Sequence, residues 1–171
     1  MKKIILLFVS LIFFNLSSYA QQEGLTEEQK EIMGELFGVN QSNITIDIDK
    51  KLFPQQIGGM YMSQKPMAIL KTKVEAKTFE QIKIKFNKDK QEKGITVEEK
   101  GSFQHNGQEY LYAIGTAMIE GKKMKMQMYA FKADDKSTAT IIGMYELIAE
   151  VDYAAAIKKS ALSAKVINVK K

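Results

Sequence analysis

Methionines that alternate along one short segment are the residues with the clearest potential for chemistry. Met124, Met126 and Met128 are separated by single polar residues. Thioether sulfur is a soft ligand that suits Cu(I), so this pattern could form a copper site. The same alternation is typical of a half-buried strand with methionine on its core face, which we favour, so we predict no metal and no cofactor. Four more methionines could add copper ligands if folding brought them close, namely Met60, Met62, Met118 and Met144.

A second candidate lies in the least regular part of the chain, between residues 50 and 65. Long irregular segments often carry binding residues, and a glycine pair beside a tyrosine and methionines could form an adaptable contact surface. The alternative is a turn, or a short strand, that tucks two of these residues under the sheet. We predict the partner-binding site here first, at Gly58, Gly59, Met60, Tyr61 and Met62.

Residues for acid–base or nucleophilic catalysis are few. His105 is the single histidine and lies at the tip of a predicted hairpin, where polar residues are expected. Glu98 and Glu99 are adjacent on a predicted strand and should therefore point to opposite faces. Other carboxylates, at Asp134, Asp135, Glu146 and Glu150, have the pattern of a solvated surface. We predict that the protein is not an enzyme, with a small carboxylate-based enzyme as an alternative.

The composition excludes several classes of function. The chain has no cysteine, which excludes thiol nucleophiles, thiolate metal sites, disulfides and a lipid anchor on a terminal cysteine. Every basic residue is lysine, so the bidentate guanidinium that commonly reads guanine or phosphate is missing. We therefore expect no nucleic-acid partner.

The first twenty residues have the pattern of a secretory signal peptide. Lys2 and Lys3 precede an apolar run over residues 4–14, and small residues at Ser18 and Ala20 mark a cleavage site. The apolar run is shorter than the roughly 20 residues that span a bilayer, so we expect no stable membrane anchor after cleavage. Cleavage after Ala20 removes the two lysines and lowers the net charge from +5 to +3.

The remaining residues, 21–171, have the length of one ordinary domain and are predicted to be α+β. Capping-box patterns at Thr26 and Thr78, and a cap at Asp152, predict three helices. Asn106-Gly107 is a strong hairpin signal within an antiparallel meander over residues 95–147. The predicted helices cover 26–37, 78–93 and 152–163, and the predicted strands cover 44–48, 67–74, 95–103, 108–119, 123–132, 137–145 and 166–169.

Three segments carry a family resemblance: the helix at 78–93 followed by Gly94 and a strand, the NGQEYLYA hairpin at 106–113, and the closing helix at 153–163 with its IKKSALS ending. Together they resemble the PsbP/DcrB-like superfamily over roughly residues 65–169. The resemblance implies an α/β sandwich and a non-enzymatic docking, assembly or chaperone module. It implies no shared active site, so no functional residues transfer to this chain.

The sequence therefore predicts an exported, non-enzymatic binding or accessory module of the bacterial envelope, periplasmic or secreted. Its partner would be an envelope protein or a small apolar ligand. Copper handling through the methionine strand is the alternative from another class. The oligomeric state is left open by these patterns.

Overall fold

The computed structural model describes residues 43–57, 59–88, 95–119 and 122–167. All of them belong to one compact unit, Gly38–Lys171. The predicted signal peptide, the helix predicted at 26–37, Gly58 and Gly94 lie outside the described residues.

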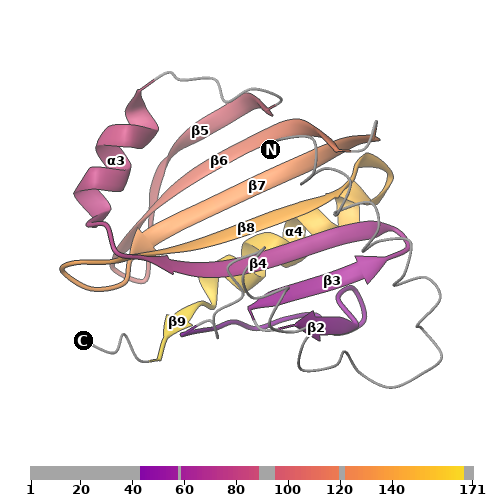
Figure 1. The fold of residues 1–171 in the computed structure, drawn as a ribbon, viewed down its shortest axis with the longest axis horizontal. Coiled ribbons are helices and arrows are strands. Elements are labelled where there is room, and N and C mark those ends of the chain that lie inside the picture. Colours follow the sequence, from indigo (N-terminus) through magenta and orange to yellow (C-terminus); the bar gives the residue numbers. More distant parts are fainter. Residues whose placement is uncertain (1–42, 58, 89–94, 120–121, 168–171) are drawn as a thin grey trace, which may run out of the picture. The chain divides into compact units, whose positions relative to one another are not determined.

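Seven antiparallel strands form the main sheet, and a separate pair of short strands forms a second sheet (Figure 1). The order in the main sheet is β2-β3-β4-β8-β7-β6-β5, and β1 pairs with β9. The predicted α+β class is confirmed. The elements are β1 (Ile44–Thr45), β2 (Gln55–Ile57), β3 (Met60–Gln64), β4 (Met67–Glu75), α3 (Phe79–Asn87), β5 (Ile95–His105), β6 (Gln108–Ile119), β7 (Lys122–Lys132), β8 (Thr138–Glu146), the 3-10 turn η1 (Leu147–Ala149), α4 (Glu150–Leu162) and β9 (Lys165–Val166).

The predicted meander is confirmed as β5 to β8, each strand hydrogen-bonded to the next. Its first turn is Asn106-Gly107, where φ is 51° and 77°. Positive φ at both central residues is the geometry of a type I′ turn, whose twist matches that of the flanking strands. This turn fixes which residues of β5 and β6 lie opposite one another.

The strand predicted at residues 44–48 is wrong beyond Thr45. β1 ends there because the backbone N–H and carbonyl of Asp47 hydrogen-bond to serine side chains of α4 and its C-cap instead of to a neighbouring strand. The Ser163 hydroxyl accepts from the Asp47 N–H at 2.8 Å, and the Ser160 hydroxyl donates to the Asp47 carbonyl at 2.7 Å. The predicted inward side chains at 46 and 48 do pack against the core.

Helix α3 begins as predicted. The Thr78 hydroxyl accepts from the Gln81 N–H, and the Gln81 side chain accepts from the Thr78 N–H, completing the capping box. The predicted cap at Asp152 is wrong. The 3-10 turn η1 leads directly into α4, whose N-cap is Ala149 without a side-chain bond, and Asp152 lies in the first turn.

Helix α4 packs on one face of the sheet, which we call the helix face, and lies behind β8 and β4 in Figure 1. Ile157 lies directly over Gly143, where a Cβ would approach within 2.5 Å of the isoleucine side chain. Helix α3 packs on the opposite face, with Phe79 against Leu111 and Ala130. No helix in the described ranges is long and apolar enough to cross a membrane.

Candidate functional site

The sheet gathers the methionines on the face opposite α4, which we call the methionine face. Alternation on β7 turns Gln127 and Tyr129 toward the helix face, and it turns Met124, Met126 and Met128 away from it. Met126 lies directly opposite Met144 of β8. Of the eight methionines that the structure describes, Met118 is the one that is not on this face. The other seven are Met60, Met62, Met67, Met124, Met126, Met128 and Met144.

A lysine interrupts the methionine face. Lys71 of β4 lies opposite Met60, and burial lowers its pKa, with a smaller contribution from the positive charge of Lys73. A cationic ligand is therefore disfavoured beside Met60. Met126 and Met144 lie directly opposite each other and neither faces a lysine in this way, so this pair is a better centre for a soft cation than Met60.

The segment proposed as a partner surface is strand rather than loop from Met60 onward. Met60 and Met62 are buried on the methionine face, while Tyr61 belongs to the core beneath α4. The Gly59 carbonyl accepts both the backbone N–H and the hydroxyl of Thr72, which ties this segment to β4. The role of Gly58, Gly59, Met60, Tyr61 and Met62 in partner binding stays a prediction.

A buried polar chain crosses the helix face. The Gln127 amide donates to the Tyr145 hydroxyl at 3.0 Å, and its carbonyl accepts from the Tyr129 hydroxyl at 3.1 Å. Burial, with smaller electrostatic contributions, raises the pKa of Tyr129 to about 12. These groups satisfy one another, so they specify how β7 and β8 pair beneath α4 rather than offering a reactive hydroxyl.

The carboxylates singled out in the sequence as catalytic candidates are engaged in ion pairs and hydrogen bonds. Glu98 and Glu99 reach partners on the same face, so the predicted opposite orientation is wrong. A register shift between Val97 and Glu99 puts two residues of β5 opposite one of β6. Glu98 pairs with Lys125 at 2.6 Å, and Glu99 accepts from Tyr112 at 2.7 Å.

The other candidate carboxylates also have partners, and Asp134 accepts from the Lys136 N–H at 2.7 Å. Lys125 approaches Glu150 at 3.6 Å, Glu146 pairs with Lys122 at 2.8 Å, and Asp135 pairs with Lys132 at 2.6 Å. No group of three or more His, Cys, Asp or Glu in the described part of the chain could hold a metal ion.

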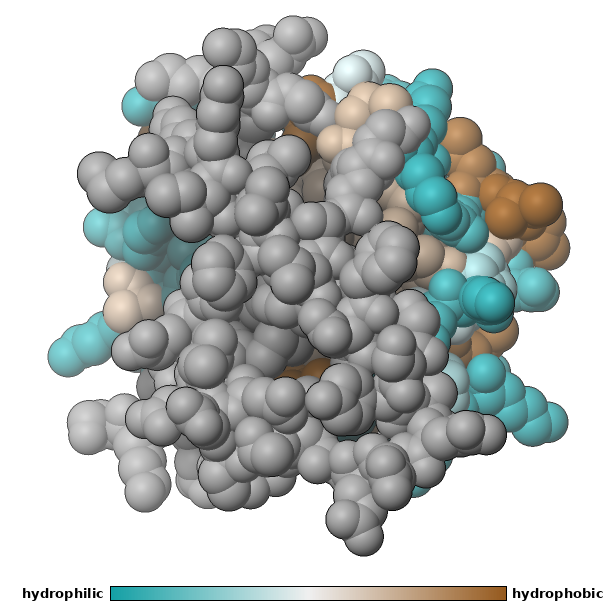
Figure 2. Space-filling model, turned by 45° about the vertical axis from the view of Figure 1, so that its right-hand side comes forward, coloured by the Kyte–Doolittle hydropathy of each residue, from teal (hydrophilic) through white to brown (hydrophobic). Residues whose placement is uncertain are grey.

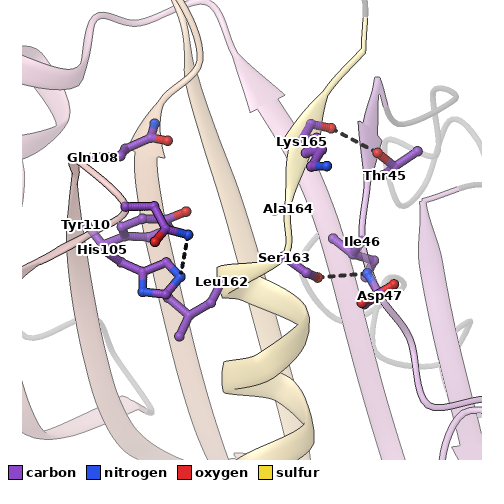
Figure 3. A pocket seen from close by; sticks show the side chains of 11 residues that line it. Thr45, Ile46, Asp47, His105, Gln108, Tyr110, Leu162, Ser163, Ala164 and Lys165 are labelled. Atoms are coloured by element: carbon purple, nitrogen blue, oxygen red, sulfur yellow. Dashed lines mark hydrogen bonds between the residues drawn. The ribbon is translucent and has the colours of Figure 1, made fainter.

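His105 lines a polar cavity of about 470 Å³. Figure 3 shows its ring beside Tyr110 on one wall, with Asp47, Ser163 and Lys165 on the other. The hairpin position was predicted, but the cavity was not, because its opposite wall comes from β1, β9 and the end of α4. Sequence patterns gave no signal that these segments meet.

An exposed apolar ridge begins where β8 passes into α4. We use "the ridge" for Leu147, Ile148 and Val151, whose exposed fractions are 39%, 90% and 88%. Figure 2, which brings the right-hand side of Figure 1 forward, shows apolar surface along its right edge. Residues 148 and 151 are three apart, so they are neighbours on one turn. The signal available in the sequence was that these apolar residues fall outside the stripe of α4 that Tyr153 and Ile157 bury.

Comparison with solved structures shows what fold this is. LpqN of Mycobacterium tuberculosis, involved in cell envelope biogenesis, matches with a TM-score of 0.52 and 10% identity over 71% of this chain and 82% of its own. Protein PA94 of Pseudomonas aeruginosa, whose function is unknown, matches with a TM-score of 0.50 and 14% identity over 77% and 85%. Both likenesses concern the fold.

Cyanobacterial PsbP of Synechocystis sp. PCC 6803 also matches, with a TM-score of 0.48 and 11% identity over 75% of this chain and 95% of its own. The likenesses to LpqN and PA94 agree with the α+β fold expected from the sequence. No protein-family model matches the chain, and a comparison with curated proteins finds no match.

Proposed function

We propose that this chain is an exported accessory module of the bacterial envelope that docks a protein partner and performs no reaction itself. The observation that carries the proposal is the ridge, where two β-branched side chains remain about nine-tenths exposed. Contiguous exposed apolar side chains rimmed by polar residues are characteristic of interaction surfaces.

Charge indicates the kind of partner. Glu150 and Asp152 flank Val151 in the first turn of α4, and both are exposed. Asp152 has no ion pair within the described residues, and Glu150 keeps only the 3.6 Å contact with Lys125. The partner that fits presents an apolar pocket bordered by basic side chains.

Two further observations support the proposal. The N-terminal pattern of lysines, apolar run and small residues is that of an exported protein. LpqN, which shares the fold, is involved in cell envelope biogenesis.

Site-specific photocrosslinking in the cells that make the protein tests this function. A photoreactive residue replaces Ile148 and Val151 in two separate variants. Two control variants carry it at the exposed apolar positions Ile84 of α3 and Ile167. We expect one and the same crosslinked envelope protein from positions 148 and 151 and none from the controls. Equal crosslinking at all four positions, or none at 148 and 151, would contradict the proposal.

Copper handling is the second candidate, and the strand register favours it. Met126 lies opposite Met144, with Met124 and Met128 two residues away on the same face. Long flexible thioethers at these positions can converge on Cu(I).

Anaerobic Cu(I) titration followed by the methionine methyl resonances tests this candidate. Copper binding would shift the methyl signals of Met126 and Met144 and leave that of the exposed Met118 unchanged. M126L and M144L, which keep the volume but remove the ligand, would abolish the shifts, whereas M118L would not. Unshifted methyl signals at Met126 and Met144 would eliminate the copper candidate.

A further inference from the structure

The polar cavity beside His105 is built from three parts of the chain that are far apart in sequence. One wall is the β5–β6 hairpin, and the other combines the residues after β1 with the end of α4 and β9 (Figure 3). Its volume of about 470 Å³ falls within the range of small-molecule sites. A concave site of this size with convergent polar groups can hold a small ligand.

Two opposite charges line the same wall without neutralising each other. Asp47 and Lys165 are both exposed, and within the described residues neither side chain makes an ion pair or hydrogen bond. Thr45 is the residue directly opposite Lys165, and Asp47 lies two residues further along the chain. Because neither charge has a partner within the described residues, a molecule that carries both opposite charges could bridge them.

The carboxyl end of α4 adds a partial negative charge to the part of the cavity that holds Asp47. Leu162, Ser163 and Ala164 line the cavity at the carboxyl end of the helix, where the macrodipole favours a positive group. Ser163 is held in place because its hydroxyl accepts from the Asp47 N–H and donates to the Ser160 carbonyl. An ammonium group would therefore be stabilised near Asp47.

The hairpin wall supplies rings and amides. The His105 and Tyr110 rings meet edge to face with centroids 6.2 Å apart, and the Asn106 amide nitrogen lies 3.2 Å from the His105 ring nitrogen. The amide of Gln108 is held by a 2.7 Å bond to the Lys132 carbonyl. This wall is held in place by the type I′ turn at Asn106-Gly107.

We propose that this cavity binds a small zwitterion of the amino-acid class. Its ammonium group contacts Asp47 and the end of α4, and its carboxylate contacts Lys165. The site is separate from the ridge, so it gives the module a small-molecule ligand in addition to a protein partner.

Titration of the full-length mature protein with L-alanine, followed by backbone amide resonances, tests the site. We expect saturable shifts at Asp47, Ser163 and Lys165. Propionate and ethylamine, which each carry one of the two charges, should give no saturable shift at the same concentrations. Saturable binding of either analogue as tight as that of L-alanine would overturn the zwitterion assignment.

Variants localise the effect. D47N and K165Q should each weaken L-alanine binding about tenfold or more, which corresponds to about 1.4 kcal/mol. The matched changes D152N and K158Q, on the exposed side of α4, should leave it unchanged. Amide spectra without ligand check that each variant is folded. Absence of shifts in the folded wild type, or equal binding by D47N, would overturn the proposal and leave the proposed docking function unaffected.

Discussion

Gln127 is the residue whose contribution to folding is most sharply defined. It is 4% exposed and joins the hydroxyls of Tyr129 and Tyr145. Sequence alternation placed it on the face opposite the neighbouring methionines and suggested a solvated position. It is buried because α4 covers that face, which depends on contacts distant in sequence.

Replacing Gln127 should therefore be costly. Q127A leaves two buried tyrosine hydroxyls without their partner, and we expect a loss of about 2–3 kcal/mol in the free energy of unfolding. Urea denaturation at constant m-value measures it. Q104A, at an exposed position of β5, is the matched control and should change stability by less than about 0.5 kcal/mol. A Q127A variant as stable as Q104A would mean that the polar chain contributes little.

Tyr129 makes stability sensitive to alkali. The unfolded phenol loses its proton near pH 10.0, whereas burial holds the folded pKa at about 12. The folded state thus retains a proton that the unfolded state releases, so stability is fully present below pH 10 and falls as the pH rises toward 12.

Y129F should weaken this alkaline loss of stability, because it removes the group that must ionise. The measurement is urea denaturation at several pH values between 9 and 12, alongside phenolate absorbance of the native protein. An identical pH profile for Y129F and wild type would show that other groups cause the loss.

At the scale of elements, locally encoded structure was predictable and long-range pairing was not. The capping box at Thr78 and the turn at Asn106-Gly107 depend on residues within four positions of each other, and both are confirmed. The pairing of Ile44 with Val166 joins opposite ends of the described chain. Local patterns do not determine such contacts, which is why the cavity between these segments was not foreseen.

The β5 bulge illustrates a different limit. Strict alternation separates Glu98 from Glu99, but one extra residue in the strand brings both to the same face. The methionines followed alternation because β7 pairs with β6 and β8 without a register shift. The shared face of the β7 methionines could therefore be predicted from the sequence, whereas the shared face of Glu98 and Glu99 could not.

Helix α4 should be sensitive to side-chain size where Ile157 packs over Gly143. G143A places a methyl group against Ile157, and we expect a loss of about 1–3 kcal/mol. I157A alone removes a fully buried side chain and should cost about 2–5 kcal/mol.

The double variant G143A/I157A distinguishes a steric conflict between these two positions from independent losses of stability. If the added methyl group fills the space that I157A vacates, the double variant should be more stable than the sum of the single changes implies. Strict additivity in urea denaturation would contradict direct packing of Ile157 on Gly143.

At the scale of the whole molecule, the predicted export signal is open to a simple measurement. We expect the mature protein to begin at Gln21, because the small residues Ser18 and Ala20 predict a cleavage site after Ala20. An N-terminal glutamine cyclises with loss of ammonia, so part of the protein should carry pyroglutamate. Intact-mass analysis of protein from the producing cells would show both species, and a mass that includes residues 1–20 would contradict cleavage.

The docking function depends on the ridge, and affinity measures it most directly. With the crosslinked partner purified, calorimetry measures its Kd for wild type, I148D and I84D. The I84D control makes the same change at an exposed position of α3. The ridge account predicts that I148D raises Kd roughly thirtyfold, about 2 kcal/mol, and that I84D binds as wild type does. Equal affinity for I148D and wild type would contradict it.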